Sequence, residues 1–162
     1  MEAVDFVILL LHPLLATVFG FWLYRHWSTI KAIHLKRGRA WSRIRDRKRE
    51  EIVTEHERQG RLALPAILGV ILLAIFANIH RYVNLDADFS ELFSLHGWLG
   101  ITLAFLTFYM SRTGKRIVSQ REERKSITKT KGIHRRAGSL LLGLLIAVMF
   151  LGFLRAIQII QP

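Results

Sequence analysis

The chain of 162 residues contains no cysteine. Disulfide bonds, thiolate ligation of haem iron and cysteine-bound iron–sulfur clusters are therefore excluded. Acidic residues are also scarce: there are 12 Asp and Glu against 24 Lys and Arg, and the interiors of the long apolar stretches contain none apart from Asp5 near the start of the first. This scarcity disfavours a pump or an ion-coupled transporter, which relays protons through carboxylates inside the membrane.

Motifs of the common hydrolases and nucleotide-binding enzymes are absent as well. The sequence has no G-x-S-x-G nucleophile elbow, no phosphate-binding loop and no H-E-x-x-H zinc motif. It therefore offers no recognisable nucleophilic or hydrolytic site, and other residue types must carry the function.

What the sequence does have is apolar residues, which make up 51% of the chain and are concentrated in four blocks. At about 1.5 Å per residue, each block is long enough to cross roughly 30 Å of hydrocarbon as a helix. None of the blocks shows the polar stripe of a soluble bundle helix. The sequence therefore predicts an all-α integral membrane bundle, a single domain over 1–162, with transmembrane helices at 4–24, 62–83, 89–111 and 137–160.

The positive charge lies in the two longer links between these helices. Residues 25–61 carry twelve Lys and Arg and residues 112–136 carry ten, whereas the charged residues of the short link 84–91 are all acidic. Because loops rich in Lys and Arg stay in the cytoplasm, both termini and the acidic link are predicted on the non-cytoplasmic side. Topology and attraction to the lipid bilayer account for the charge, so nucleic acid is not expected as a partner.

The two basic links are predicted to differ in structure. Residues 42–59 alternate acids and bases at helical spacing, so we expect them to extend the second helix into the cytoplasm, with Gly38 as the break before them. The segment 128–138, with the sequence TKTKGIHRRAG, is expected to be a flexible connector to the fourth helix.

Four of the seven histidines lie near the ends of the apolar blocks, and each is followed four residues later by Gly or Ala. Residues i and i+4 share one face of a helix, so a small residue there leaves room for a flat macrocycle beside the imidazole. This pattern is typical of a membrane protein that holds haem. The four sets are His12 with Ala16, His56 with Gly60, His96 with Gly100, and His134 with Gly138.

His12 and His96 lie inside predicted spans, where an imidazole without a partner is costly. Both helices enter from the same side of the membrane, so the two residues have similar depth and suit bis-axial ligation of one haem iron. The alternative explanation is that each forms a polar hydrogen bond between helices.

His134 and His56 are the candidates for a second haem near the cytoplasmic surface. His134 stands at the cytoplasmic start of the fourth helix, and His56 lies on the predicted extension of the second. His34, which is also followed by a glycine, competes with His56 for this place. His80, near the outer end of the second helix, is expected at the edge of the outer haem, at a substrate or at the membrane interface.

Three segments resemble parts of a known family. The segment FANIHRYVNLDADFSELFSLHGWLG resembles the region of eukaryotic-type cytochrome b561 proteins where one helix ends and the next begins with LYSLHSWLG. HPLLATVFGF and HRRAGSLLLGLLIAVMFLGF are similar to two further helices of that family. The likeness covers all four spans, and SLHGWLG is its most specific part. The family has six helices, of which this chain shows the central four, with a longer basic link between the first two.

The resemblance implies two b-type haems in a relay that passes electrons across the membrane, from ascorbate to monodehydroascorbate or ferric iron. It implies that His12 and His96 bind the iron of the non-cytoplasmic haem. It also implies that His134 binds the cytoplasmic haem, where His56 fits approximately as the second ligand. A chain that holds only the outer haem stays open as an alternative.

Three residues are candidates for the substrate sides. His80 resembles a family residue near the outer substrate, and Phe93 stands where the family often has Tyr. On the cytoplasmic side Arg135, together with other arginines near the membrane, is the candidate to attract an anionic reductant.

The sequence therefore predicts a b-type dihaem membrane cytochrome, a transmembrane oxidoreductase of the ascorbate- or ferric-reductase type. Its expected partners are a small redox donor and acceptor or a larger electron-transfer complex, in a plasma or thylakoid membrane. A homodimer follows from the resemblance. The competing interpretation is a single-haem or haem-free membrane subunit, or an assembly factor, of a larger respiratory or photosynthetic complex.

Overall fold

The computed structural model describes residues 3–85, 88 and 94–160. All regular structure in this part of the chain is helical, which confirms the predicted all-α class. One helix is short, α2 (Arg39–Ile44). The four long helices are α1 (Ala3–Leu35), α3 (Arg49–Asn84), α4 (Leu95–Glu122) and α5 (Thr128–Ile160).

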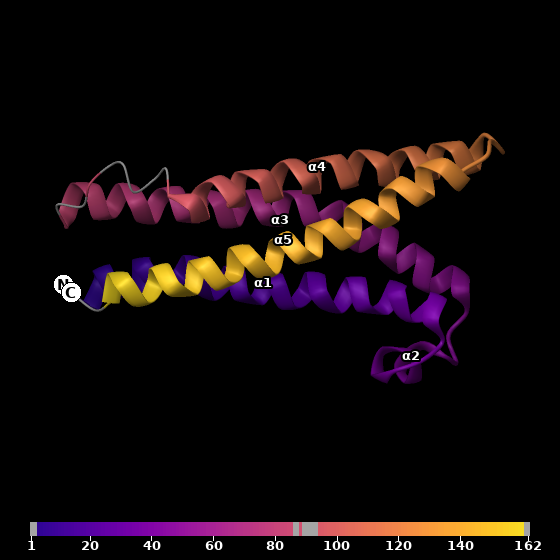
Figure 1. Cartoon of the computed structure of the whole chain (residues 1–162), viewed down its shortest axis with the longest axis horizontal. Helices are drawn as coiled ribbons and strands as arrows, with labels where there is room; N and C mark the ends of the chain where they lie inside the picture. The colour runs from indigo at the N-terminus through magenta and orange to yellow at the C-terminus, as the bar shows by residue number, and fades with distance from the viewer. Residues whose placement is uncertain (1–2, 86–87, 89–93, 161–162) are drawn as a thin grey trace.

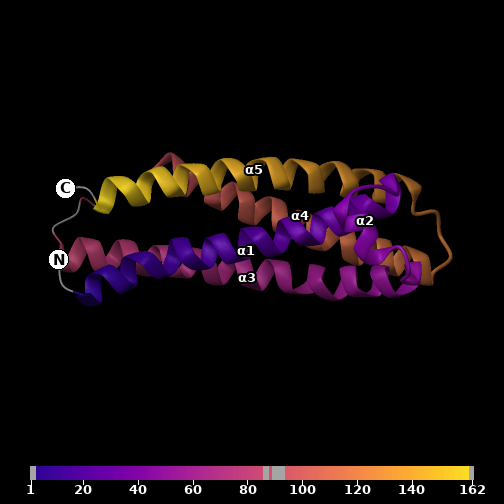
Figure 2. The same ribbon diagram turned by 90° about the horizontal axis from the view of Figure 1, so that it is seen from below.

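The long helices form an antiparallel bundle, as Figure 1 and Figure 2 show. Each packs against two neighbours in the cyclic order α1, α3, α4, α5. The start of α1, the end of α3, the start of α4 and the end of α5 lie together, and we call this the terminal end. The opposite end carries α2 and the two basic links, and we call it the basic end.

The outer faces of the bundle are apolar, as expected for contact with lipid. Phe105 and Phe150, for example, are 70% and 61% exposed. Three described helices, α1, α3 and α5, are long and apolar enough to cross a membrane. α4 is not among them, because charged residues follow from Arg112 onward and residues 89–93 of its predicted span lie outside the described residues. It packs along α3 and α5 all the same, so four spans stay a prediction.

Every long helix extends past its predicted membrane segment at the basic end. α1 continues to Leu35, and α3 begins at Arg49, so the predicted extension of the second helix is confirmed from residue 49 onward. Its first part, from residue 42, is wrong, because residues 42–44 belong to α2 and residues 45–48 are not helical. The expected flexible connector at 128–138 is wrong, because α5 already begins at Thr128. Lys, Arg and Ala favour a helix, and the segment packs against α4, where the Thr130 hydroxyl donates to Gln120 at 2.9 Å.

The predicted break at Gly38 is confirmed. Its φ of +87° lies in the left-handed region, which glycine enters without strain, and the residue separates α1 from α2. The chain then folds back, so that Ile44 of α2 packs with Ala32 of α1 and Ile52 of α3 in a small buried cluster.

At the terminal end, α1 and α3 are joined by a hydrogen bond between nearly buried side chains. His80 Nε2 lies 2.9 Å from Asp5 Oδ1, and the two side chains are 14% and 13% exposed. The Asn84 amide donates to His80 Nδ1 at 3.1 Å, so Nε2 carries the proton that is donated to Asp5.

Replacing Asp5 by Ala should destabilise the bundle by about 1–3 kcal/mol, because the buried His80 ring loses its acceptor. The measurement is reversible unfolding of the protein in mixed micelles, followed by circular dichroism. His80→Ala should cost a similar amount, and the double variant should cost no more than either single variant. Simple addition of the two single effects would contradict the contact.

Candidate functional site

His12 on α1 and His96 on α4 lie against each other near the terminal end. Their ring centroids are 6.2 Å apart and their planes cross at 73°. His12 Nδ1 is 3.0 Å from the carbonyl oxygen of Val70, and His96 Nδ1 is 3.1 Å from that of Val148. A carbonyl can only accept, so both Nδ1 atoms carry the proton. Each Nε2 therefore keeps a lone pair for another ligand.

Gly152 on α5 makes room for the His96 ring. A Cβ atom at position 152 would lie 2.8 Å from His96 Cε1, which is closer than side chains approach. The ring therefore lies directly against the backbone of α5, one turn away from Val148. Nothing in the sequence distinguishes Gly152 from the other glycines of this helix, and it was not predicted as part of a site.

A second pair with similar geometry lies toward the basic end. His56 on α3 and His134 on α5 have ring centroids 6.1 Å apart and planes that cross at 85°. His134 Nδ1 is 2.9 Å from the Thr113 hydroxyl, which donates its own proton to the Met110 carbonyl at 3.0 Å and so accepts from the ring. The Nδ1 atom of His56, in contrast, is buried without a hydrogen-bond partner in the described part of the chain.

The structure places His56, and not His34, beside His134. His34 lies in the last turn of α1 and makes no ring contact with His134 among residues 3–85, 88 and 94–160. A further histidine, His26, lies parallel to His56 with the ring centroids 4.5 Å apart, and its Nδ1 contacts the Gln59 side chain. His26 was not predicted as a site residue, since no small residue follows it four positions later.

The small residues beside the histidines provide open space in two of the four cases. A Cβ atom at Gly60 or at Gly100 would meet nothing within 4 Å. At Gly138 it would lie 3.3 Å from Met110 Cε, the flexible end of a side chain. Ala16 is partly buried. Both histidine pairs therefore have free space on at least one flanking helix face.

The residues predicted on the substrate sides lie apart from one another. His80 is at the terminal end with Asp5, Arg135 is exposed next to His134, and Phe93 lies outside the described residues. Among the residues that the structure describes, no three His, Asp or Glu side chains come together to hold a metal ion. A metal centre here has to be built on two histidines.

Both pairs have the spacing that two-histidine ligation requires. A bond from imidazole nitrogen to a first-row metal ion is about 2 Å, and the ring centre lies roughly 1 Å beyond the nitrogen, so imidazoles on opposite sides of one ion have centroids about 6 Å apart. The separations of 6.2 and 6.1 Å agree with this value.

The two pairs are separated along the bundle by an apolar core. α3 carries both His56 and Val70, the residue that binds His12, and at about 1.5 Å per residue these positions are about 21 Å apart. The buried side chains of this core come from all four long helices and exclude water from the space between the pairs. They are Phe19, Leu23, Ile67, Leu103 and Leu145.

Comparison with protein families matches the chain to the model of the eukaryotic cytochrome b561 family over residues 49–158. His56, His96 and His134 lie inside this stretch, and His12 precedes it. Comparisons with curated proteins and with solved structures found no match. The family match covers more than half of the chain, and an all-helical membrane bundle is the architecture of that family. The chain therefore belongs to the cytochrome b561 family, whose members bind haem b and transport electrons in membranes.

Proposed function

We propose that this chain holds two b haems, one between His12 and His96 and one between His56 and His134, and conducts electrons across the bilayer. The proposal rests on one observation: the same geometry occurs at two levels of the bundle. At each level, two imidazoles from different helices lie about 6 Å apart. The four proposed ligands come from the four long helices, one from each.

The residues around the histidines support this role. The carbonyls of Val70 and Val148 hold the rings of His12 and His96 in one orientation and one tautomer, with Nε2 available to the metal. The Thr113 hydroxyl does the same for His134. Such acceptors also raise the basicity of the ligand nitrogen. When bound, haem supplies one-electron chemistry, and ligation by two histidines leaves no open position for a substrate.

The apolar core between the two histidine pairs separates the two proposed haem sites. The apolar side chains around Ile67 and Leu145 fill the space between the pairs, which disfavours a path for water and protons along this route. The ligand levels are about 21 Å apart, and bound haems would shorten the distance that an electron has to cross between them.

We further propose a reductase of the ascorbate or ferric type, with the electron donor at the basic end and the acceptor at the terminal end. Exposed Arg135 lies beside His134 and would attract an anionic reductant. At the other end the His80 and Asp5 pair would border the acceptor. By the distribution of Lys and Arg, the basic end faces the cytoplasm and both termini lie outside, in a plasma or thylakoid membrane. The exposed apolar faces would also allow pairing as a homodimer.

Haem content per polypeptide tests the proposal directly. The purified protein should carry two haems, with a Soret band and a split α-band after reduction with dithionite. His12→Ala or His96→Ala should remove one haem, and His56→Ala or His134→Ala the other. His34→Ala is the matched control and should leave both in place. Two haems that survive replacement of both His12 and His96 would rule out the pair at the terminal end.

Gly152→Leu should remove the haem at the terminal end alone, because the new side chain occupies the space of the His96 ring. Gly143→Leu is the control on the same helix, since a Cβ atom there meets nothing within 4 Å. Haem content and a redox titration of both variants show whether the haem at the terminal end is lost. Equal haem content in the two variants would show that the His96 position does not depend on Gly152.

Thr113→Val should raise the potential of one of the two haems, because His134 loses its acceptor and becomes a weaker base. Retention of that haem should also weaken, by roughly 10–100-fold. Thr107→Val is the control: Thr107 is buried on the same helix and donates to Leu103 without contacting a histidine. A redox titration in which both variants behave like the original protein would remove Thr113 from the site.

A further inference from the structure

A cavity of about 390 Å³ lies between the basic-end parts of α1, α2 and α3. Its size falls in the range of sites for small molecules or headgroups. α2 forms part of the wall, and α2 precedes residues 49–158, so this wall lies outside the stretch that matches the family. The lining combines arginines and histidines, Arg25, His26, Arg43 and His56, with apolar side chains, Trp22, Ile30, Ile44 and Ile52.

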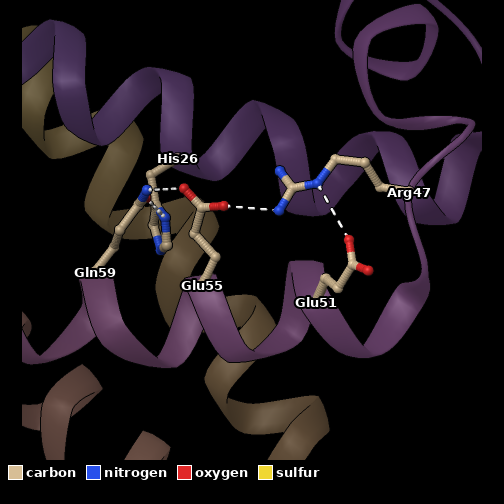
Figure 3. A network of polar contacts seen from close by, with 5 residues as sticks. All are labelled: His26, Arg47, Glu51, Glu55 and Gln59. Atoms are coloured by element: carbon tan, nitrogen blue, oxygen red, sulfur yellow. Dashed lines mark hydrogen bonds and ion pairs between the residues drawn. The ribbon is translucent and has the colours of Figure 1, made fainter.

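One further arginine of the cavity is neutralised within the protein, as Figure 3 shows. Arg47 donates to Glu55 at 2.9 Å and lies 3.8 Å from Glu51. Glu55 also accepts from Gln59, which in turn contacts His26. Arg47 is therefore already occupied.

Arg25 and Arg43 have no such carboxylate partner in the part of the chain that the structure describes. In the described part of the chain, neither side chain forms an ion pair or a hydrogen bond, and both residues are exposed. A guanidinium group stays protonated at any physiological pH. The cavity therefore presents two positive charges without a counter-charge, which favours an anionic ligand.

The position of the cavity indicates where this anion comes from. Arg25 directly follows the predicted span 4–24, so it lies at the level of the lipid headgroups. The apolar side chains of Ile30 and Ile44 line the same space and suit the glycerol and first acyl carbons of a lipid. The planar fork of an arginine also matches the oxygens of a phosphate.

We propose that this cavity binds the headgroup phosphate of an anionic phospholipid, held between Arg25 and Arg43. Such a lipid would also lie beside the stacked His26 and His56 rings, which belong to the same lining. A soluble phosphate has the same chemistry and is the alternative source. The cavity shares His56 with the proposed haem site, but the lipid is held by Arg25 and Arg43, which bind no haem, so the two proposals are tested by different variants.

The test uses the full chain in nanodiscs of phosphatidylcholine doped with phosphatidylglycerol. After extraction into detergent at raised salt, where diffuse attraction is screened, retained phosphatidylglycerol is counted by native mass spectrometry. The double variant Arg25→Gln/Arg43→Gln should retain it about 30-fold less well, from roughly fivefold per arginine. Arg37→Gln/Arg39→Gln removes the same charge from the same link outside the cavity, and retention should stay unchanged.

A second variant separates charge from geometry. Arg25→Lys/Arg43→Lys keeps both charges but loses the guanidinium forks, so retention should fall between the original protein and the glutamine variant. Equal loss in the Arg37/Arg39 control would overturn the site in favour of a diffuse basic surface. The lipid assignment would be wrong if inorganic phosphate, added to phosphatidylcholine nanodiscs, stabilised the protein and phosphatidylglycerol did not. The stabilisation by phosphate would also have to disappear in the Arg25→Gln/Arg43→Gln variant.

Discussion

The arrangement depends on one kind of interaction, the hydrogen bond from a histidine Nδ1 to an acceptor on a neighbouring helix. His12 ties α1 to Val70 of α3, His96 ties α4 to Val148 of α5, and Thr113 of α4 binds His134 of α5. In a hydrocarbon surrounding, a polar group that stays unpaired is costly, so each of these bonds stabilises its helix pair. The same bonds fix the rings that face each other. Helix packing and the candidate site are thus consequences of one set of contacts.

Much of this could be predicted from local sequence patterns. Apolar runs long enough to cross a bilayer predicted the helical segments, and the alternation of charges predicted the extension of α3 from residue 49 onward, though not the separate helix α2 before it. Three of the four paired histidines were identified by a glycine four residues later, and the fourth was identified by an alanine. This works because residues i and i+4 lie on one face of a helix, independent of tertiary structure. The break at Gly38 was also predicted, and the tolerance of glycine for positive φ explains it.

The rest depends on how the helices are rotated against one another, which the sequence does not encode locally. Backbone carbonyls such as that of Val148 have no side-chain signature, so their role as acceptors could not be anticipated. The importance of Gly152 comes from the approach of His96 on another helix. His34 and His56 have the same glycine spacing, and only the packing of α3 beside α5 brings His56 to the pair. The helical start at Thr128 likewise reflects packing against α4, a contact that the local sequence does not reveal.

The continuation of the long helices past the membrane segments has a consequence for encounters with other molecules. Many of the basic residues at this end are fixed on regular helices and not on mobile loops, from Arg49 on α3 and from Thr128 on α5. A docking molecule therefore meets a preorganised platform and pays little ordering entropy. His56 lies about 10 Å of helix from the start of α3, so its depth below this end is set by helical rise. The side chains on these helices already have their positions when such a molecule arrives.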